Sequence, residues 1–240
     1  MLLLISTSFL AAQNQTFRIH VDHVYPSSTA AYEKISKKIA DLAVENKEKE
    51  GWNVLWTNDN KVISISPVKG WEELGNAFMP NTQAKMGDQK FRELFEEFDR
   101  HYDKHNDYIL TLNSNLSYMP DGMTVNPQGK NYRKNTLMYY KARDRKKVEE
   151  IAQKFKDLYS KKGSKSHYRV YFSGFGVEES YIMVVGSAVN ALEYQKQAEE
   201  NRKLIGDDSR KLWDELSQYV TRREYIEGNM RPDLSYVPGK

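Results

Sequence analysis

The residues best suited to acid–base chemistry lie near the beginning of the chain. His20 and Asp22 stand two positions apart in an alternating stretch, so on a β-strand they share one face, and His23 lies on the other. An imidazole beside a carboxylate can act as a general base, because neighbouring charge tunes its pKa toward neutrality. The alternative is a polar, solvated strand edge without chemistry.

The histidines are unevenly distributed. Four of the five lie in the first half, and only His167 lies in the second. This distribution suggests that one half keeps a site, although so few residues also fit chance. His101 and His105 are four apart and would share a face of a helix, where two imidazoles can hold a metal ion. No third ligand is evident, and we predict no metal site.

Aromatic side chains form a second candidate group. The chain has 16 tyrosines, and aromatic residues cluster on two predicted hairpins, at Trp52, Trp56, Tyr168, Tyr171 and Phe172. Such residues either line a pocket for a flat apolar ligand or fill the seam between two sheets. The ligand-binding candidates are therefore His20, Asp22, His23, Trp56, Tyr118 and Tyr236.

Composition excludes several functional classes. The chain has no cysteine, so disulfides, cysteine nucleophiles and thiolate zinc sites are ruled out. Its 36 basic and 33 acidic residues give a net charge of +3, without the unopposed basic surface that nucleic acids require. There is also no phosphate-binding loop, nucleophile elbow or zinc signature. We expect no nucleic-acid partner.

The apolar run at 2–12 predicts export. It ends in small residues and is followed by a polar stretch, and its length suits a signal peptide but not a membrane span. A basic segment before it is missing, so the true start of the signal lies upstream in this interpretation. The alternative is a buried first strand or a tail. We expect a leader over 1–16 and a periplasmic or secreted protein with no membrane span.

The elements that position these residues occur twice in the same order. Alternation and helical periodicity predict strand, helix, strand, strand, helix, strand in each half. In the first half these are 17–25, a helix to about 46, 52–57, 61–66, 88–107 and 116–119, with looser helical character at 71–78. In the second half they are 136–143, a helix after Asp144, 167–173, 181–186, a helix whose apolar stripe spans 212–220, and 234–237, with a further helical stretch at 189–204.

A short motif marks the end of each half. Leu-Ser-Tyr-Met-Pro begins at Leu116, and Leu-Ser-Tyr-Val-Pro begins 118 residues later at Leu234. The apolar stripes of the first helices repeat with a constant separation of 116 residues. These repeats indicate internal duplication, with a first repeat at 17–119, a linker at 120–135 and a second repeat at 136–238. Tyr118 and Tyr236 become equivalent positions.

A unit of this order is the ferredoxin-like βαββαβ arrangement, in which both helices cover one face of a four-stranded antiparallel sheet. The bare faces of the two sheets would pack together, giving an α+β protein whose tandem repeats form an intrachain barrel. The tandem pattern resembles the dimeric α+β-barrel superfamily. That superfamily includes antibiotic-biosynthesis monooxygenases, EthD-like and NIPSNAP-like proteins, chlorite dismutases and dye-decolourising peroxidases, and no motif of one member family is matched.

These observations favour an exported binding or structural protein with a pocket for a small apolar or aromatic ligand. The resemblance implies an alternative, a cofactor-independent monooxygenase-like or haem-dependent enzyme that uses the barrel interior. Haem would need an axial ligand inside the barrel, and spacing assigns none, so the cofactor is unknown. Two fused repeats make either a monomer that imitates a dimer or a homodimer. Whether the protein is an enzyme stays open at the level of sequence.

Overall fold

The computed structural model describes residues 14–239. The segment predicted as an export leader falls almost wholly outside the described residues. The first two residues of the first strand, β1 (Gln15–Val24), lie within that predicted leader. Gln15 and Thr16 already pair with the neighbouring strands, so an intact barrel keeps both residues.

Each half contains four strands and its own helices. The first half is built from β1, α1 (Thr29–Glu45), β2 (Asn53–Thr57), β3 (Lys61–Val68), α2 (Pro80–Met86), α3 (Asp88–Phe98) and β4 (Tyr102–Tyr118). The second is built from β5 (Tyr132–Tyr140), α4 (Arg145–Lys162), β6 (Tyr168–Ser173), β7 (Tyr181–Ala188), α5 (Ala191–Ser217) and β8 (Val220–Met230). Both predicted hairpins are confirmed, as are the apolar stripes of α1 and α4.

The eight strands close into one antiparallel barrel in the order β1-β3-β2-β8-β5-β7-β6-β4. Within each half the order is that of a ferredoxin-like sheet, β4-β1-β3-β2 and β8-β5-β7-β6. The halves are joined edge to edge, because β2 pairs with β8 and β4 pairs with β6. The predicted α+β class is confirmed, and hydrogen bonds at both seams leave neither sheet with a free edge.

Apolar side chains fill the barrel. Alternate residues of each strand point inward, as Ile19 and Val21 do on β1, while His20 and Asp22 point outward. The buried inner side chains form one cluster: Phe17, Ile19, Val21, Leu55, Ile63, Leu110, Leu112, Leu137, Tyr139, Tyr171, Tyr181, Met183, Val185 and Met230. The barrel interior, which the sequence left open as either a pocket or a packed core, is therefore packed mainly with apolar side chains over the described residues.

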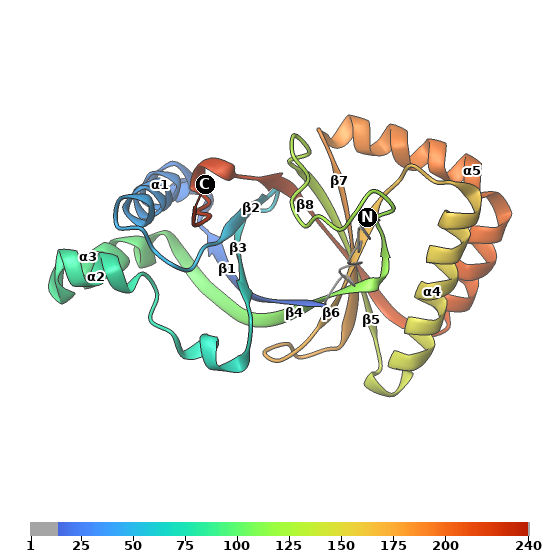
Figure 1. The fold of residues 1–240 in the computed structure, drawn as a ribbon, viewed down its shortest axis with the longest axis horizontal. Helices are drawn as coiled ribbons and strands as arrows, with labels where there is room; N and C mark the ends of the chain where they lie inside the picture. The colour runs from blue at the N-terminus through green and yellow to red at the C-terminus, as the bar shows by residue number, and fades with distance from the viewer. Residues whose placement is uncertain (1–13, 240) are drawn as a thin grey trace, which may run out of the picture.

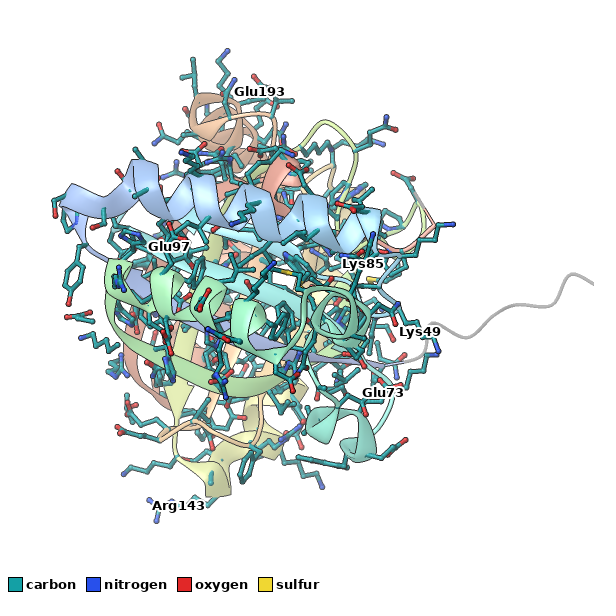
Figure 2. All side chains as sticks on the ribbon, turned by 90° about the vertical axis from the view of Figure 1, so that its left-hand side faces the viewer. Lys49, Glu73, Lys85, Glu97, Arg143 and Glu193 are labelled. Atoms are coloured by element: carbon teal, nitrogen blue, oxygen red, sulfur yellow. The ribbon has the colours of Figure 1, made fainter. Side chains whose placement is uncertain are left out.

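The helices cover the outside of the barrel in two groups. Figure 1 shows α1, α2 and α3 on one side of the barrel and α4 and α5 on the other. Seen from the first side, α1 and α3 lie across the sheet, and the view labels the charged side chains of Lys85 on α2 and Glu97 on α3 (Figure 2). Each helix group encloses its own apolar cluster against the outer face of the sheet. Together with the cluster inside the barrel, the described residues form three apolar cores.

The second helix of the first half is shorter than predicted. The sequence predicts a helix over 88–107, but α3 ends at Phe98, and β4 begins at Tyr102 and continues to Tyr118. The spacing of aromatic residues up to Tyr102 fits a helix. Pairing of β4 with the whole length of β1 instead makes the residues from Tyr102 onward a strand. His101 consequently lies in a short 3-10 turn and His105 on a strand, so they share no helix face.

The last strand of the second half is also misplaced in the prediction. Residues 220–230 form β8, whereas the sequence places Val220 on a helix and the closing strand at 234–237. Strand β8 carries the charged residues Arg222, Arg223 and Glu224 and lies between β2 and β5. Pairing with these two strands, and not an apolar sequence, therefore makes it a strand. Strand β5 also begins earlier than predicted, at Tyr132 inside the predicted linker. Its Arg133 and Asn135 are buried and face into the barrel, where the strand pattern predicts apolar side chains.

The predicted helical stretch at 189–204 and the helix after it are one element. Helix α5 runs from Ala191 to Ser217 and is interrupted only by a kink at Gly206, whose φ of 58° suits glycine. In the first half, the corresponding segment contains a 3-10 turn at Trp71–Gly75 and the short helix α2 before α3.

The two Leu-Ser-Tyr segments fasten each half to the other. Ser117 Oγ accepts a hydrogen bond from the Val170 amide at 2.9 Å, and Ser235 Oγ accepts one from the Val54 amide at 2.9 Å. The segment after Ser235 forms an isolated bridge between Tyr236 and Trp52, just before β2, because it follows β8 and is not part of it. The segments are equivalent in bonding although only the first ends a long strand.

Candidate functional site

The outer face of β1 carries charged residues beneath α1 and α3. His20 and Asp22 lie two residues apart on this face, as the alternation predicts. The antiparallel register sets His20 opposite Asp107 of β4 and Asp22 opposite His105. Pairing of β1 with β4 thus gathers four titratable side chains that are remote in sequence.

His20 is held between two carboxylates. Its Nε2 lies 3.0 Å from Asp22 Oδ1, and its Nδ1 lies 3.0 Å from Asp107 Oδ1. The Asp22 side chain is 2% exposed and that of Asp107 is 56% exposed, so one carboxylate is at the floor of the site and the other at its mouth. The His105 ring stacks beside His20, with ring centroids 5.4 Å apart.

These carboxylates determine the charge of His20. Burial lowers the pKa of the imidazole, but the hydrogen bond and charge of Asp22, followed by those of Asp107, outweigh burial and raise the pKa to about 9. His20 is therefore an imidazolium at neutral pH. The general-base role considered for it from sequence does not suit this protonation state, and any base in this cluster is a carboxylate.

Tyr32 of α1 completes the buried cluster. Its hydroxyl donates to Asp22 Oδ2 at 2.6 Å, and the side chain is fully buried. Burial and the Asp22 charge raise the pKa of Tyr32 strongly, so the phenol stays neutral and remains a donor. The ring packs against Phe98 at 4.4 Å and against Trp56 at 5.8 Å between centroids.

A cavity of about 330 Å³ lies over this cluster, between the sheet and the helices. Its walls are mainly aromatic and aliphatic, and polar side chains reach it from β1, β3 and β4, from α1 and from the turn at Asp99, with Arg18 as a second basic residue beside His20. The lining includes His20, Asp22, Tyr32, Ser36, Trp52, Ser64, Phe78, Phe95, Phe98, Tyr102 and Asp107. Although Asp22 Oδ1 is close to His20, it accepts no aligned hydrogen bond from any residue that the structure describes.

The second half lacks this polar cluster at the equivalent positions. Thr136 pairs with Tyr225 and Val184 as His20 pairs with Asp107 and Ser64. Likewise, Met138 pairs with Arg223 and with Ile182, where Asp22 pairs with His105 and Val62. The corresponding space of about 190 Å³ is lined mainly by apolar residues, among them Met138, Val148 and Phe155. The same framework therefore folds without the His20 cluster.

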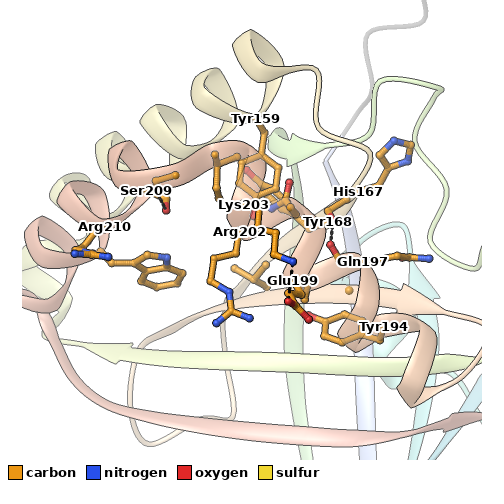
Figure 3. Close-up of a pocket in the computed structure, with 18 of the residues that line it drawn as sticks. Tyr159, His167, Tyr168, Tyr194, Gln197, Glu199, Arg202, Lys203, Ser209 and Arg210 are labelled. Atoms are coloured by element: carbon orange, nitrogen blue, oxygen red, sulfur yellow. Dashed lines mark hydrogen bonds and ion pairs between the residues drawn. The ribbon is translucent and has the colours of Figure 1, made fainter.

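A larger cavity of about 820 Å³ lies beside α5, where α4, β6 and β7 meet that helix. Figure 3 shows Tyr159, Tyr168 and Tyr194 with the charged residues of α5 around them. The Lys203 Nζ lies 2.9 Å from Glu199 Oε1, and both side chains are more than half exposed. Because these charges are already paired in solvent, we regard the smaller cavity, with its buried carboxylate, as the better candidate site.

The other predicted ligand residues do not join the His20 cavity. His23 lies on the opposite face near the end of β1, where burial and the charges of Lys104 and Lys61 lower its pKa. Trp56 packs behind Tyr32 and faces Arg231 at 5.6 Å.

Tyr118 and Tyr236 act on the backbone of the opposite half. Their hydroxyls donate to the carbonyl oxygens of Ser164 at 2.9 Å and Glu48 at 2.7 Å. Each bond ties down the loop between a helix and the strand after it. The structure thus places both tyrosines in equivalent structural contacts.

Three residues that line the cavity are absent from the predicted ligand-binding set. Tyr32 lies in the helix predicted to end at about 46, and Asp107 and Tyr102 lie in the helix predicted over 88–107. Only the register of β1 with β4 brings Asp107 to His20, and only the packing of α1 brings the Tyr32 hydroxyl to Asp22. A run rich in aromatic, aliphatic and β-branched residues over 108–112 was the available signal for a strand there.

The cluster does not suit a metal ion or haem. Within residues 14–239, no three His, Asp or Glu side chains converge in an arrangement that could hold a metal ion. A haem iron needs a neutral imidazole nitrogen with a free lone pair. Both nitrogens of His20 face carboxylates and its raised pKa keeps it protonated, so His20 does not fit as an axial ligand.

Neither a protein-family model nor a curated protein sequence matches the chain. Solved structures share its fold. An anthrone oxidase-like protein superposes with a TM-score of 0.65 at 9% identity, covering 95% of both chains. A proposed monooxygenase from Lactobacillus acidophilus NCFM gives 0.57 at 10%, covering 95% of this chain and 98% of that one. Chlorite dismutase from Candidatus Nitrospira defluvii gives 0.52 at 8%, covering 91% and 92%.

These likenesses show that the chain shares the fold of these structures, and they single out no family. At such low identity they establish the shared architecture alone. No helix within residues 14–239 is long and apolar enough to cross a membrane.

Proposed function

We propose that the chain binds a small aromatic molecule with a hydrogen-bond donor in the cavity over His20 and Asp22. The observation that carries this proposal is the buried Asp22 carboxylate beneath an aromatic-walled cavity, whose Oδ1 is ion-paired with His20 at 3.0 Å and has no further donor among the described residues. A carboxylate oxygen is an acceptor with two lone pairs, so Oδ1 can take a second partner besides His20. A ligand hydroxyl or ring N–H would supply that partner.

The size and walls of the cavity define the ligand class. A volume of about 330 Å³ is at the lower end of the range for small-molecule sites and suits a molecule of one or two fused rings. The rings of Trp52, Phe95 and Phe98 offer faces and edges for stacking. The buried carboxylate of Asp22 disfavours an anionic group at the floor, so we expect a neutral phenol or a related N–H heterocycle.

An enzymatic role is the second candidate. Two of the structures that share the fold are described as a proposed monooxygenase and an anthrone oxidase-like protein, which supports oxidation of an aromatic substrate by dioxygen. Asp22 could take the proton from the substrate hydroxyl, and His20 would stabilise the carboxylate network beside it. This chemistry uses the same cavity and places no haem there.

Calorimetric titration with 2-naphthol and naphthalene tests the binding role. A hydrogen bond to a charged group contributes about 1.5–3 kcal/mol, so 2-naphthol should bind at least about tenfold more tightly than naphthalene. Asp22→Asn should remove most of this preference, whereas Met138→Leu at the equivalent position of the second half should leave it intact. Equal affinities for the two probes, or a preference unchanged in Asp22→Asn, would count against the proposal.

Oxygen consumption separates the two candidates. Dioxygen uptake with 2-naphthol that is lost in Asp22→Asn would support the enzyme, and tight binding without uptake would leave the binding role. Haem reconstitution provides a check on the cofactor. A Soret band that His20→Gln abolishes would contradict the exclusion of His20 as an axial ligand.

We also propose that the two halves derive from a duplicated unit, of which the first retained the polar cluster. The matching strand register and the equivalent Leu-Ser-Tyr contacts support this origin. Because the barrel closes within one chain, we propose a monomer that imitates a dimer.

Export remains a proposal based on the apolar run at 2–12. It is tested by mass spectrometry of the mature N-terminus from the native host. Cleavage at or before Asn14 would leave β1 whole, and an uncleaved Met1 would contradict export.

A further inference from the structure

Two arginines are buried inside the barrel at the end that the linker covers. Arg133 of β5 and Arg169 of β6 lie on the inward faces of their strands and are 3% and 2% exposed. Ser187 of β7 pairs with Arg133, and Val185 of the same strand pairs with Arg169. The sheet register thus brings two guanidinium groups to one small region, on the opposite side of the sheet from the helices.

Both guanidinium groups donate to neutral acceptors. Arg133 donates to the carbonyl oxygens of Lys130 and Tyr132 and to Asn126 Oδ1, the last at 2.7 Å. Arg169 donates to the Thr124 carbonyl oxygen at 3.1 Å and to Ser187 Oγ. Among residues 14–239, neither arginine forms an ion pair with a carboxylate.

The charge in this region is uncompensated. Removing an ion from water costs several kcal/mol even after relaxation, and buried charges in proteins are normally paired. Burial, together with the charge of Arg169, lowers the pKa of Arg133 to about 9, and burial lowers that of Arg169. Both groups still carry a positive charge at neutral pH, and each repels the other.

One hydrogen-bond donor of this arginine pair has no acceptor within residues 14–239. Arg169 Nε is buried and has no acceptor among the described residues, and the nearby Asn135 Oδ1 is also buried without a donor. Asn135 lies across Val185 from Arg169 in the sheet, but its Oδ1 is itself an acceptor, so only the unpaired Arg169 Nε–H points to an anion. An unpaired N–H on a buried cation identifies a place where an acceptor, preferably an anion, is missing.

We propose that this end of the barrel binds a small inorganic anion of the size and charge of chloride beside Arg133 and Arg169. The apolar core fills the adjacent interior, and Met123 and Val125 of the linker pack against that core, so a larger anion would not fit. The anion accepts from Arg169 Nε–H and neutralises the guanidinium pair. It also stabilises the linker, because the same arginines hold Thr124, Asn126 and Lys130.

Thermal unfolding of the full chain in sodium chloride and in sodium gluconate, at equal ionic strength, tests the site. At a chloride concentration about tenfold above Kd, the wild-type Tm should rise by roughly 3–5 °C relative to gluconate. Arg169→Met should lose this rise. Arg143→Met, at an exposed arginine outside the barrel, should retain it.

Anomalous diffraction from crystals grown in sodium bromide gives a readout that does not depend on a variant. A bromide peak beside Arg169 Nε supports the site even if Arg169→Met fails to fold. Equal Tm values in chloride and gluconate, together with no bromide peak between the arginines, would show that ordered water alone satisfies them and would overturn the proposal.

Discussion

Asp22→Asn should lower the pKa of His20 and weaken the pH dependence of stability. In the wild type the folded-state pKa of His20 is about 9, against 6.5 for the free imidazole, and Asp22 is the larger of the two charged causes. This difference corresponds to about 3.4 kcal/mol at 1.36 kcal/mol per pH unit. Because the His20 side chain is 36% exposed, solvent screening reduces the contribution to roughly 1–2 kcal/mol.

The sign follows from proton linkage. The native state binds the His20 proton more tightly than the unfolded state, so this stabilisation is complete below about pH 6.5 and is lost as pH rises through about 9. The free energy of unfolding should therefore fall by roughly 1–2 kcal/mol more in the wild type than in His20→Gln between pH 6 and pH 10.

Two measurements check this reasoning. NMR titration of the imidazole Cε1–H should place the wild-type His20 midpoint near 9 and shift it down by more than about one pH unit in Asp22→Asn. Urea unfolding across the same pH range should give the stability difference. His23→Gln is the matched control for the fall in stability above pH 7, because burial lowers the pKa of His23 from 6.5, so its own titration acts below that pH and with the opposite sign. A wild-type midpoint near 6.5, or one unmoved by Asp22→Asn, would refute the argument.

Three further substitutions probe the site and the barrel. Tyr32→Phe leaves Asp22 Oδ2 without its 2.6 Å hydrogen bond and should lower the free energy of unfolding by about 1–3 kcal/mol in urea titrations. Gly228→Ala places a Cβ 2.2 Å from a backbone carbonyl oxygen of β2, so it should disrupt the β2–β8 seam and lower Tm by roughly 5 °C. Tyr118→Phe and Tyr236→Phe should each cost about 1 kcal/mol, by similar amounts, because their hydroxyls make equivalent bonds to the opposite half.

Controls are available for each substitution. Gly75→Ala adds a Cβ that meets no atom within 4 Å, and the exposed Tyr25 allows a Tyr→Phe change without a buried partner. If Gly228→Ala and Gly75→Ala have the same Tm, the β2–β8 seam does not limit stability. A loss confined to one of Tyr118→Phe and Tyr236→Phe would show that their equivalent bonds contribute unequally.

The amino-acid sequence by itself determined the α+β class, the order of elements in each half, both hairpins and the buried stripes of α1 and α4. These features depend on local periodicity, which side-chain alternation and helical spacing record directly. The sequence also placed His20 and Asp22 on one face, because two residues along a strand always share a face.

Only the tertiary structure decided where the long strands β4 and β8 run and which side of the sheet faces a cavity. Their sequences are polar or helix-like, and they become strands because β1 and β5 need antiparallel partners to close the barrel. That closure packs the interior, moves the cavity beneath the helices and brings Asp107 to His20. Contacts between residues so distant in sequence depend on strand register, which no local pattern records.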